Sequence, residues 1–244
     1  MNEALHLLCL DRYHLDDVLF VQALARSLAG AGQAAPPCVI VHGSGERAER
    51  MLEGQGIFLE RKNGVLQGTS PGEVALLERA LRETSQKLVA ALTDAMVYAV
   101  GVQGADRSLL RMMPDGETGG RLAVGKTGWI RELAAKRALP AIAATVLDPE
   151  RGHLQEVSTA EAVVALGQAF GAEGSVEVVF FTKTNRPGLL REKAVLSEIA
   201  VEELPGESVL PEPLSLQHVA KTGLPVRITS VGAFLTGEGT RVVL

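Results

Sequence analysis

Long apolar runs are missing from this sequence, which argues against one whole class of protein. A helix that crosses a bilayer needs about 20 consecutive apolar residues, and the apolar stretches here are far shorter. The opening Met1-Asn2-Glu3 also lacks the positive charge that begins a secretory signal peptide. We therefore expect a cytoplasmic protein with no membrane partner.

Cysteine and basic charge are scarce as well. The two cysteines, Cys9 and Cys38, fall on separate expected strands and lack the paired spacing of zinc or redox motifs. We therefore expect free thiols in a reducing compartment and no metal site. The 24 Lys and Arg residues are outnumbered by 29 Asp and Glu, and the net charge is −5. That balance offers no basic surface to nucleic acid.

Aliphatic residues and glycine are plentiful, in contrast to aromatic residues. Of the 244 residues, 46% are hydrophobic, only 4% are aromatic, and 26 are glycine. Short apolar runs alternate with amphipathic segments along the chain. We expect strands at 5–10, 37–41, 96–100, 138–146, 176–181, 225–228 and 240–244, and helices at 16–28, 44–54, 70–92, 128–136, 158–170 and 214–221. This alternation predicts an α/β fold, a three-layer α/β/α sandwich around a mostly parallel sheet.

A polar break at 148–152 is the clearest candidate boundary. It predicts one domain, residues 1–244, with a lobe at 1–150 and a second lobe at 151–244. Two hairpins are expected within the first lobe. One turns at Asn63-Gly64, a pair that favours tight turns, and the other joins strands at 109–113 and 121–124.

The turn Gly43-Ser44-Gly45 is the best candidate for an anion site. It follows a β-branched strand and precedes a charged helix. Glycine lets backbone N–H groups approach an anion closely, and the helix dipole favours negative charge there. The same turn is also typical of a tight strand-to-helix connection with Ser44 as the N-cap. Both interpretations remain open at this point.

Several cationic side chains follow expected strands and could reach a bound phosphate. These residues are Arg12, Lys126, Lys183 and Arg186. Each of them alone is more typical of a solvated loop residue. His42 ends a strand, where it could contact a ligand or hydrogen-bond its own loop. The stretch from Gly120 to Thr127 has P-loop spacing, but its four intervening residues are strand-like, so we assign no P-loop.

Five short motifs, taken in order, resemble the amino acid kinase family and, within it, the acetylglutamate kinase branch. They are Val39 to Gly45, Gly64 to Thr69, Ala99 to Asp106, Val124 to Lys126, and Phe170 to Glu173. The tail, Gly223 to Ile228 with Gly239-Thr240, is more similar to the aspartokinase branch. The resemblance extends over nearly the whole chain.

This resemblance implies ATP-dependent phosphorylation of the carboxylate of an acylated amino acid, a small acidic metabolite. Mg²⁺ would accompany the nucleotide, and the helix at 70–92 would contribute to a homodimer. The resemblance implies that the first lobe binds the acceptor and the second the nucleotide. The acceptor residues would be His42, Gly43, Ser44, Gly45, Gln67 and Gly68, and the nucleotide residues Thr182, Lys183, Arg186 and Gly188. Arg12, Lys126 and Lys183 are the candidates for catalytic positive charge.

Four positions depart from the charged residues of that family. Asp11-Arg12-Tyr13-His14 replaces a lysine with paired glycines, and Gln67 replaces an arginine that clamps the substrate. Ala160 stands in place of a catalytic aspartate, and Leu210 to Ser215 replaces a segment with a second catalytic lysine. One preorganised charge at such a site is worth about 3 kcal/mol. The second interpretation is therefore a non-catalytic ligand-binding or regulatory homologue, a pseudokinase.

Overall fold

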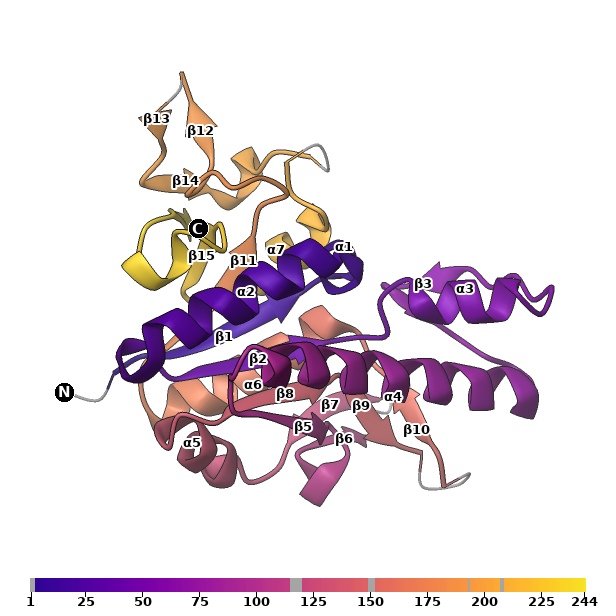
Figure 1. The fold of residues 1–244 in the computed structure, drawn as a ribbon. Coiled ribbons are helices and arrows are strands. Elements are labelled where there is room, and N and C mark those ends of the chain that lie inside the picture. Colours follow the sequence, from indigo (N-terminus) through magenta and orange to yellow (C-terminus); the bar gives the residue numbers. More distant parts are fainter. Residues whose placement is uncertain (1–2, 115–119, 149–151, 193, 207–208) are drawn as a thin grey trace.

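The computed structural model describes residues 3–114, 120–148, 152–192, 194–206 and 209–244. Within these residues the centre is an eight-stranded sheet in the order β14-β16-β15-β11-β1-β2-β8-β5 (Figure 1). Its strands are β1 Leu5–Leu10, β2 Cys38–His42, β5 Ala99–Gln103, β8 Leu139–Ala143, β11 Val176–Phe181, β14 Glu198–Ala200, β15 Val226–Thr229 and β16 Thr240–Val243. All neighbouring strands are parallel except β15 and β16, which are antiparallel. The expected mostly parallel sheet is confirmed.

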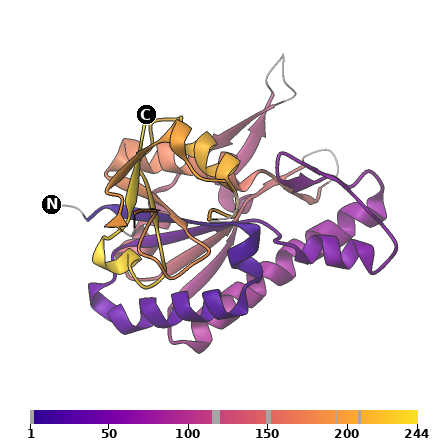
Figure 2. The same ribbon diagram turned by 90° about the horizontal axis from the view of Figure 1, so that it is seen from above.

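Helices cover both faces of this sheet, as seen from above in Figure 2. α2 (Val18–Ala31) and α4 (Pro71–Asp94) pack on one face. α5 (Gly128–Ala135), α6 (Thr159–Glu173) and α7 (Pro213–Ala220) pack on the other. On β1, Leu8 joins the first core and Leu7 the second. Burial on both faces explains why β1 is apolar throughout instead of alternating.

Two of these helices begin at residues whose side chains cap them. Asp17 accepts hydrogen bonds from the N–H groups of Leu19 and Phe20 and so caps α2. Ser70 and Glu73 form a reciprocal capping box at the start of α4, which satisfies two backbone donors that the helix itself leaves free. α4 then runs the full length expected of it.

Other local expectations need correction. A short helix, α1 (Arg12–Asp16), which we had not predicted, follows β1. α3 spans Arg47–Glu53, with Glu46 as its N-cap, so the expected capping role of Ser44 is wrong. β5 begins three residues later than the strand predicted at 96–100, after Met96 adopts a left-handed φ of 68°.

Short elements surround the main sheet. The Asn63-Gly64 turn joins β3 (Arg61–Lys62) to β4 (Val65–Leu66), as predicted. The other short pairs are β6 (Leu110–Met113) with β7 (Arg121–Val124), β9 (Thr145–Leu147) with β10 (Leu154–Glu156), and β12 (Leu190–Arg191) with β13 (Ala194–Val195). Single 3₁₀ turns occupy Gly32–Ala34, Asp106–Ser108, Val201–Glu203 and Phe234–Thr236. Most of the predicted turn at 114–120 and the centre of the break at 148–152 lie outside the described residues.

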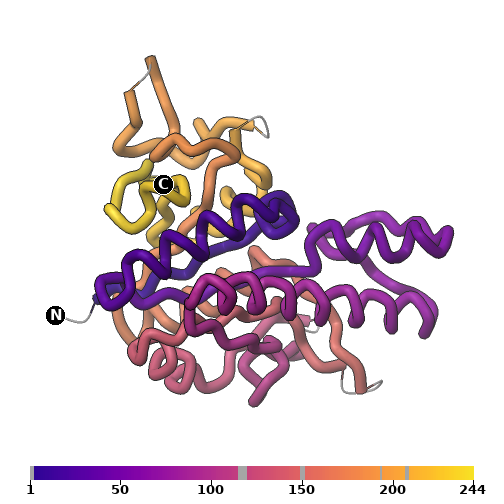
Figure 3. The backbone as a smooth tube through the Cα atoms, viewed as in Figure 1, coloured from indigo at the N-terminus to yellow at the C-terminus, as the bar shows by residue number. Residues whose placement is uncertain are grey.

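α3, the β3–β4 hairpin and the first half of α4 extend beyond the edge of the sheet (Figure 3). They are held together by a small apolar cluster of Ala48, Leu52, Leu66 and Ala80. No helix among the described residues is long and apolar enough to cross a membrane. This projecting unit forms one wall of the candidate site.

Candidate functional site

The turn after β2 holds carboxylates of the protein itself. The backbone N–H and the hydroxyl of Ser44 donate to Glu156 Oε1 and Oε2, at 2.6 and 2.8 Å. Asp16 Oδ2 accepts from Glu46 N at 2.5 Å, and Asp16 also pairs with Arg50. Three donors at or beside the predicted anion site, two from Ser44 and one from Glu46, are therefore occupied by carboxylates of the chain.

The glycines of this turn permit the close approach. A Cβ on Gly43 would lie 2.5 Å from Glu156 Oε1, well inside contact distance. Gly45 has a φ of 63° and lies against the Asp16 carboxylate. Gly43 must be glycine because a side chain would clash with Glu156. Gly45 must be glycine because its positive φ is unfavourable for other residues.

His42 lies directly before the turn and is wholly buried. Its Nδ1 donates to the carbonyl of Gly43 at 2.9 Å, and its Nε2 has no hydrogen-bond partner among the described residues. Burial lowers the pKa of His42 to about 4, because water no longer stabilises the charged ring. The imidazole is therefore neutral near pH 7.

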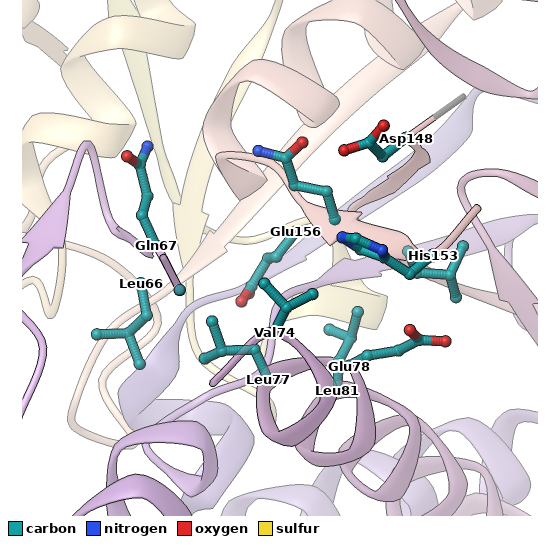
Figure 4. A pocket seen from close by; sticks show the side chains of 12 residues that line it. Leu66, Gln67, Val74, Leu77, Glu78, Leu81, Asp148, His153 and Glu156 are labelled. Atoms are coloured by element: carbon teal, nitrogen blue, oxygen red, sulfur yellow. The ribbon is translucent and has the colours of Figure 1, made fainter. Parts of the chain in front are cut away.

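A cavity of about 170 Å³, here called the α4 cavity, lies beside the turn (Figure 4). Val74, Leu77 and Leu81 of α4 form an apolar wall on one side of it. Its polar lining residues are Gln67, Glu78, Asp148, His153, Gln155 and Glu156. The predicted acceptor residues Gln67 and Gly68 both line it. A Cβ on Gly68 would lie 2.9 Å from the N atom of Val74, so this glycine lets the hairpin pack on α4.

The α4 cavity is acidic. None of its described lining residues is Lys or Arg. Glu78 pairs with Arg82, one helical turn further on. Burial raises the pKa of Glu156, against the lowering effect of its hydrogen bonds with Ser44. Burial therefore disfavours the ionised form of Glu156 beside the turn.

A second hollow of about 460 Å³, the α6–α7 cleft, lies where the β3–β4 turn approaches the first turns of α6 and α7. Arg12 lines it and donates from Nε to Glu212 Oε1 at 3.1 Å. Ser158 lines it too and caps α6 through the N–H of Glu161. Helix N-termini and one arginine are groups that favour bound phosphate.

A third hollow of about 260 Å³, the Lys183 hollow, lies against α1 and α2. The Lys183 ammonium stands 5.2 Å from the centre of the Tyr13 ring. His14 is buried there, with Nδ1 2.8 Å from Asp11 Oδ2 and Nε2 3.1 Å from the carbonyl of Thr182. Tyr13 and His14 thus occupy the end of β1, where the resemblance places glycines.

The other predicted residues lie apart from these contacts. Lys126 precedes Thr127, whose hydroxyl contacts Glu173 at the far end of α6. The 15 residues of α6 separate that end from the α6–α7 cleft by about 22 Å. Gly188 packs against β16, where a Cβ would lie 2.7 Å from Thr240 Oγ1. Arg186 is exposed on the loop before it.

Sequence reasoning missed Glu78, His153 and Glu212. A signal for Glu78 existed, because positions 74, 77, 78 and 81 share one face of a helix. A carboxylate within the apolar face of a helix indicates a specific structural or binding role for that side chain. His153 and Glu212 had no comparable signal, since their roles depend on contacts between distant segments.

Comparison with known proteins gives matches along nearly the whole chain. A model described as the amino acid kinase family matches residues 10–225. Acetylglutamate kinase from Chloroflexus aurantiacus is 32% identical over 213 residues, covering 81% of this chain and 78% of that protein. Aspartate kinase from Synechocystis superposes with a TM-score of 0.64 at 17% identity, over 99% of this chain and 40% of that one. An isopentenyl phosphate kinase superposes with a TM-score of 0.63 at 16% identity, over 98% of this chain and all of that one.

Proposed function

Because the chain belongs to the amino acid kinase family, as its motifs predicted, we propose that it transfers the γ-phosphoryl group of ATP to the carboxylate of a small amino-acid derivative. The supporting observation is that two hollows adjoin at one edge of the sheet. The β3–β4 hairpin gives Leu66 to the α4 cavity and Gly64 to the α6–α7 cleft. The segment before α6 likewise gives Glu156 to the cavity and Ser158 to the cleft.

In this proposal the acceptor occupies the α4 cavity, beside Gln67 and Gly68. Its reacting carboxylate takes the Ser44 donors, which Glu156 must release. The triphosphate lies in the α6–α7 cleft, between Arg12 and the N-termini of α6 and α7. Thr182 and Lys183 line a separate hollow, so we place the phosphates away from these residues.

The transfer needs little covalent help from the protein. A carboxylate oxygen of the acceptor attacks the γ-phosphorus in line, the bond to the β–γ bridging oxygen breaks, and ADP leaves with that electron pair. Arg12 and the two helix N-termini stabilise the charge that develops on the moving group. No group of three His, Cys, Asp or Glu in the described residues is arranged to hold a metal. Mg²⁺ would accompany the nucleotide, bound by its phosphate oxygens.

The test of this proposal is formation of ADP and acyl phosphate from Mg-ATP and N-acetyl-L-glutamate. Arg12→Ala should lower kcat about 100-fold, the loss typical of one preorganised charge. Arg26→Ala is the matched control, since Arg26 lies on α2 and donates to the carbonyl of Gln22. Activity that is equal in both variants would contradict the assignment of Arg12.

A second candidate is the non-catalytic ligand-binding homologue. The observation in its favour is that Glu156 and Asp16 occupy the turn and Glu212 pairs with Arg12. Calorimetric titration with Mg-ATP and with N-acetyl-L-glutamate separates the two candidates. Binding without phosphoryl transfer would support the homologue, and turnover would exclude it. The homodimer, the cytoplasmic location and the two lobes stay predictions.

A further inference from the structure

We propose that Arg61 is a positioning residue of the acceptor site. It fastens the β3–β4 hairpin to the turn after β2 and places positive charge beside whichever carboxylate the Ser44 donors hold. This inference deepens the proposed function and rests on it for the identity of the acceptor. Arg61 lies just before the motif Gly64 to Thr69, so the sequence motifs did not select it.

The first argument is the set of hydrogen bonds that Arg61 donates to three different segments. Its Nη2 donates to the carbonyl of Gly45 at 2.6 Å, in the turn after β2. Its Nη1 donates to the carbonyl of Gly64 at 2.8 Å, and its Nε to Glu49 Oε1 of α3 at 2.9 Å. A guanidinium holds its N–H donors in a rigid planar fork. The three contacts together therefore keep the turn, the hairpin and α3 in one arrangement.

The second argument is the burial of this arginine. The Arg61 side chain is 11% exposed, whereas the other arginines of the projecting unit, Arg47, Arg50, Arg79 and Arg82, are 27% to 70% exposed. Water and salt screen a buried charge much less than an exposed one. Arg61 is therefore the arginine of this unit whose charge acts most strongly on its neighbours.

The third argument is that this charge reaches the carboxylate now held by the Ser44 donors. Burial raises the pKa of Glu156, while its hydrogen bonds with Ser44 and then the positive charge of Arg61 lower it. Glu49 acts in the opposite sense, but more weakly than Arg61. Glu156 occupies the place that the proposed function gives to the acceptor carboxylate. A carboxylate that replaced it there would be stabilised by the same positive charge.

The hydrogen bonds of Arg61 also fix one wall of the α4 cavity. Arg61 lies opposite Leu66 in the β3–β4 pair, and Leu66 and Gln67 line the cavity. The hairpin is a separate two-stranded sheet beyond the edge of the main sheet (Figure 3), so the main sheet gives it no hydrogen bonds. Through Gly45, Arg61 holds that wall at a fixed place relative to Ser44.

The first measurement is hydrogen exchange of the full chain without any ligand. In Arg61→Gln we expect the amides of the β3–β4 hairpin to exchange about 10-fold faster, because the hairpin is no longer tied to the turn. Arg47→Gln is the matched control. Arg47 belongs to the same projecting unit, but its side chain donates to Glu83 of α4 instead, so hairpin exchange should stay as in wild type. Unchanged exchange in Arg61→Gln would overturn the positioning role.

The second measurement is calorimetric titration with N-acetyl-L-glutamate, again without nucleotide. Arg61→Gln should bind this carboxylate about 10-fold more weakly than wild type, because one nearby positive charge is lost. Arg61→Lys keeps the charge without the planar fork, so its affinity should stay within about 3-fold of wild type. Circular dichroism establishes that each variant is folded. A purely structural arginine would make the lysine variant as weak as the glutamine variant.

Three results of the titration would overturn the inference: no binding of N-acetyl-L-glutamate to wild type, equal affinity of wild type and Arg61→Gln, or equal weakening by Arg61→Gln and Arg47→Gln. Neither measurement involves ATP, so such a failure leaves the assay of ADP formation to be decided separately. Weaker binding by Arg61→Gln, with no ADP formed by wild type, would count against the proposed function alone.

Discussion

His42 is the residue at which burial has its clearest electrostatic consequence. The folded chain holds this imidazole neutral, with a pKa of about 4 against an ordinary 6.5. The unfolded chain takes up a proton near pH 6.5, whereas the folded chain does so only near pH 4. The neutral His42 therefore contributes fully to the free energy of unfolding above pH 6.5, and this contribution is lost as the pH falls toward 4. The full span corresponds to about 3 kcal/mol.

This residue gives a prediction for the pH dependence of stability. His42→Gln should remove that component, so its free energy of unfolding should fall about 2 kcal/mol less than wild type between pH 7 and pH 4.5. Urea unfolding at both pH values measures the difference. The control is His218→Gln, because His218 is exposed on α7. Its replacement should leave the change in unfolding free energy with pH as it is in wild type. Parallel slopes for wild type and His42→Gln would contradict the argument.

At the scale of elements, the caps determine where helices begin. Ser70→Ala should destabilise the protein by about 1 kcal/mol, because α4 loses the side-chain acceptor of its capping box. Ser70→Gly should cost only a few tenths of a kcal/mol. Chemical denaturation monitored by circular dichroism provides the measurement. Ser197→Ala, at an exposed position between strands, is expected to change nothing, and an equal loss there would count against the cap.

The elements that sequence could predict are those with local causes. Apolar runs predicted β1, β2 and β11, and amphipathic spacing predicted α2 and α4. α1 escaped because its five residues are too few for a periodic pattern. It is held by Asp11, the residue just before it, and by the contact between His14 and the carbonyl of Thr182, 168 residues away. The N-cap interpretation of Ser44 is wrong for a similar reason, since its hydrogen-bond partner Glu156 is 112 residues away.

At the scale of the whole molecule, β1 joins two parts of one sheet. It pairs with β2 on one side and β11 on the other. Leu8 is fully buried on this strand, so Leu8→Ala should cost about 3 kcal/mol through the cavity that it leaves. We expect the loss to appear equally in both predicted lobes.

Two reporters measure that prediction. Trp129 is the only tryptophan and reports on the first lobe by fluorescence, while hydrogen exchange of the β15 amides reports on the second. Leu214→Ala is the control, because Leu214 is 77% exposed and its loss should cost less than 0.5 kcal/mol. Separate transitions for the two reporters would show that the lobes unfold independently.

The candidate site was predicted only in part. Sequence motifs located the turn at Ser44 and the hairpin residue Gln67, and both contribute to or adjoin the α4 cavity. The motifs could not predict that Lys126 lies at the opposite end of α6 from Arg12, since that separation follows from three-dimensional packing. The carboxyl groups of Glu78 and Glu156 likewise line one cavity although they belong to distant parts of the sequence.

The hydrogen bonds between Glu156 and Ser44 have one further consequence. A ligand oxygen that binds Ser44 must displace a Glu156 oxygen, so ligand binding at Ser44 exchanges one hydrogen-bond acceptor for another. The measured affinity then reports a difference between two similar contacts. A released Glu156 side chain regains water, which favours its ionised form, and proton release on binding would reveal the exchange.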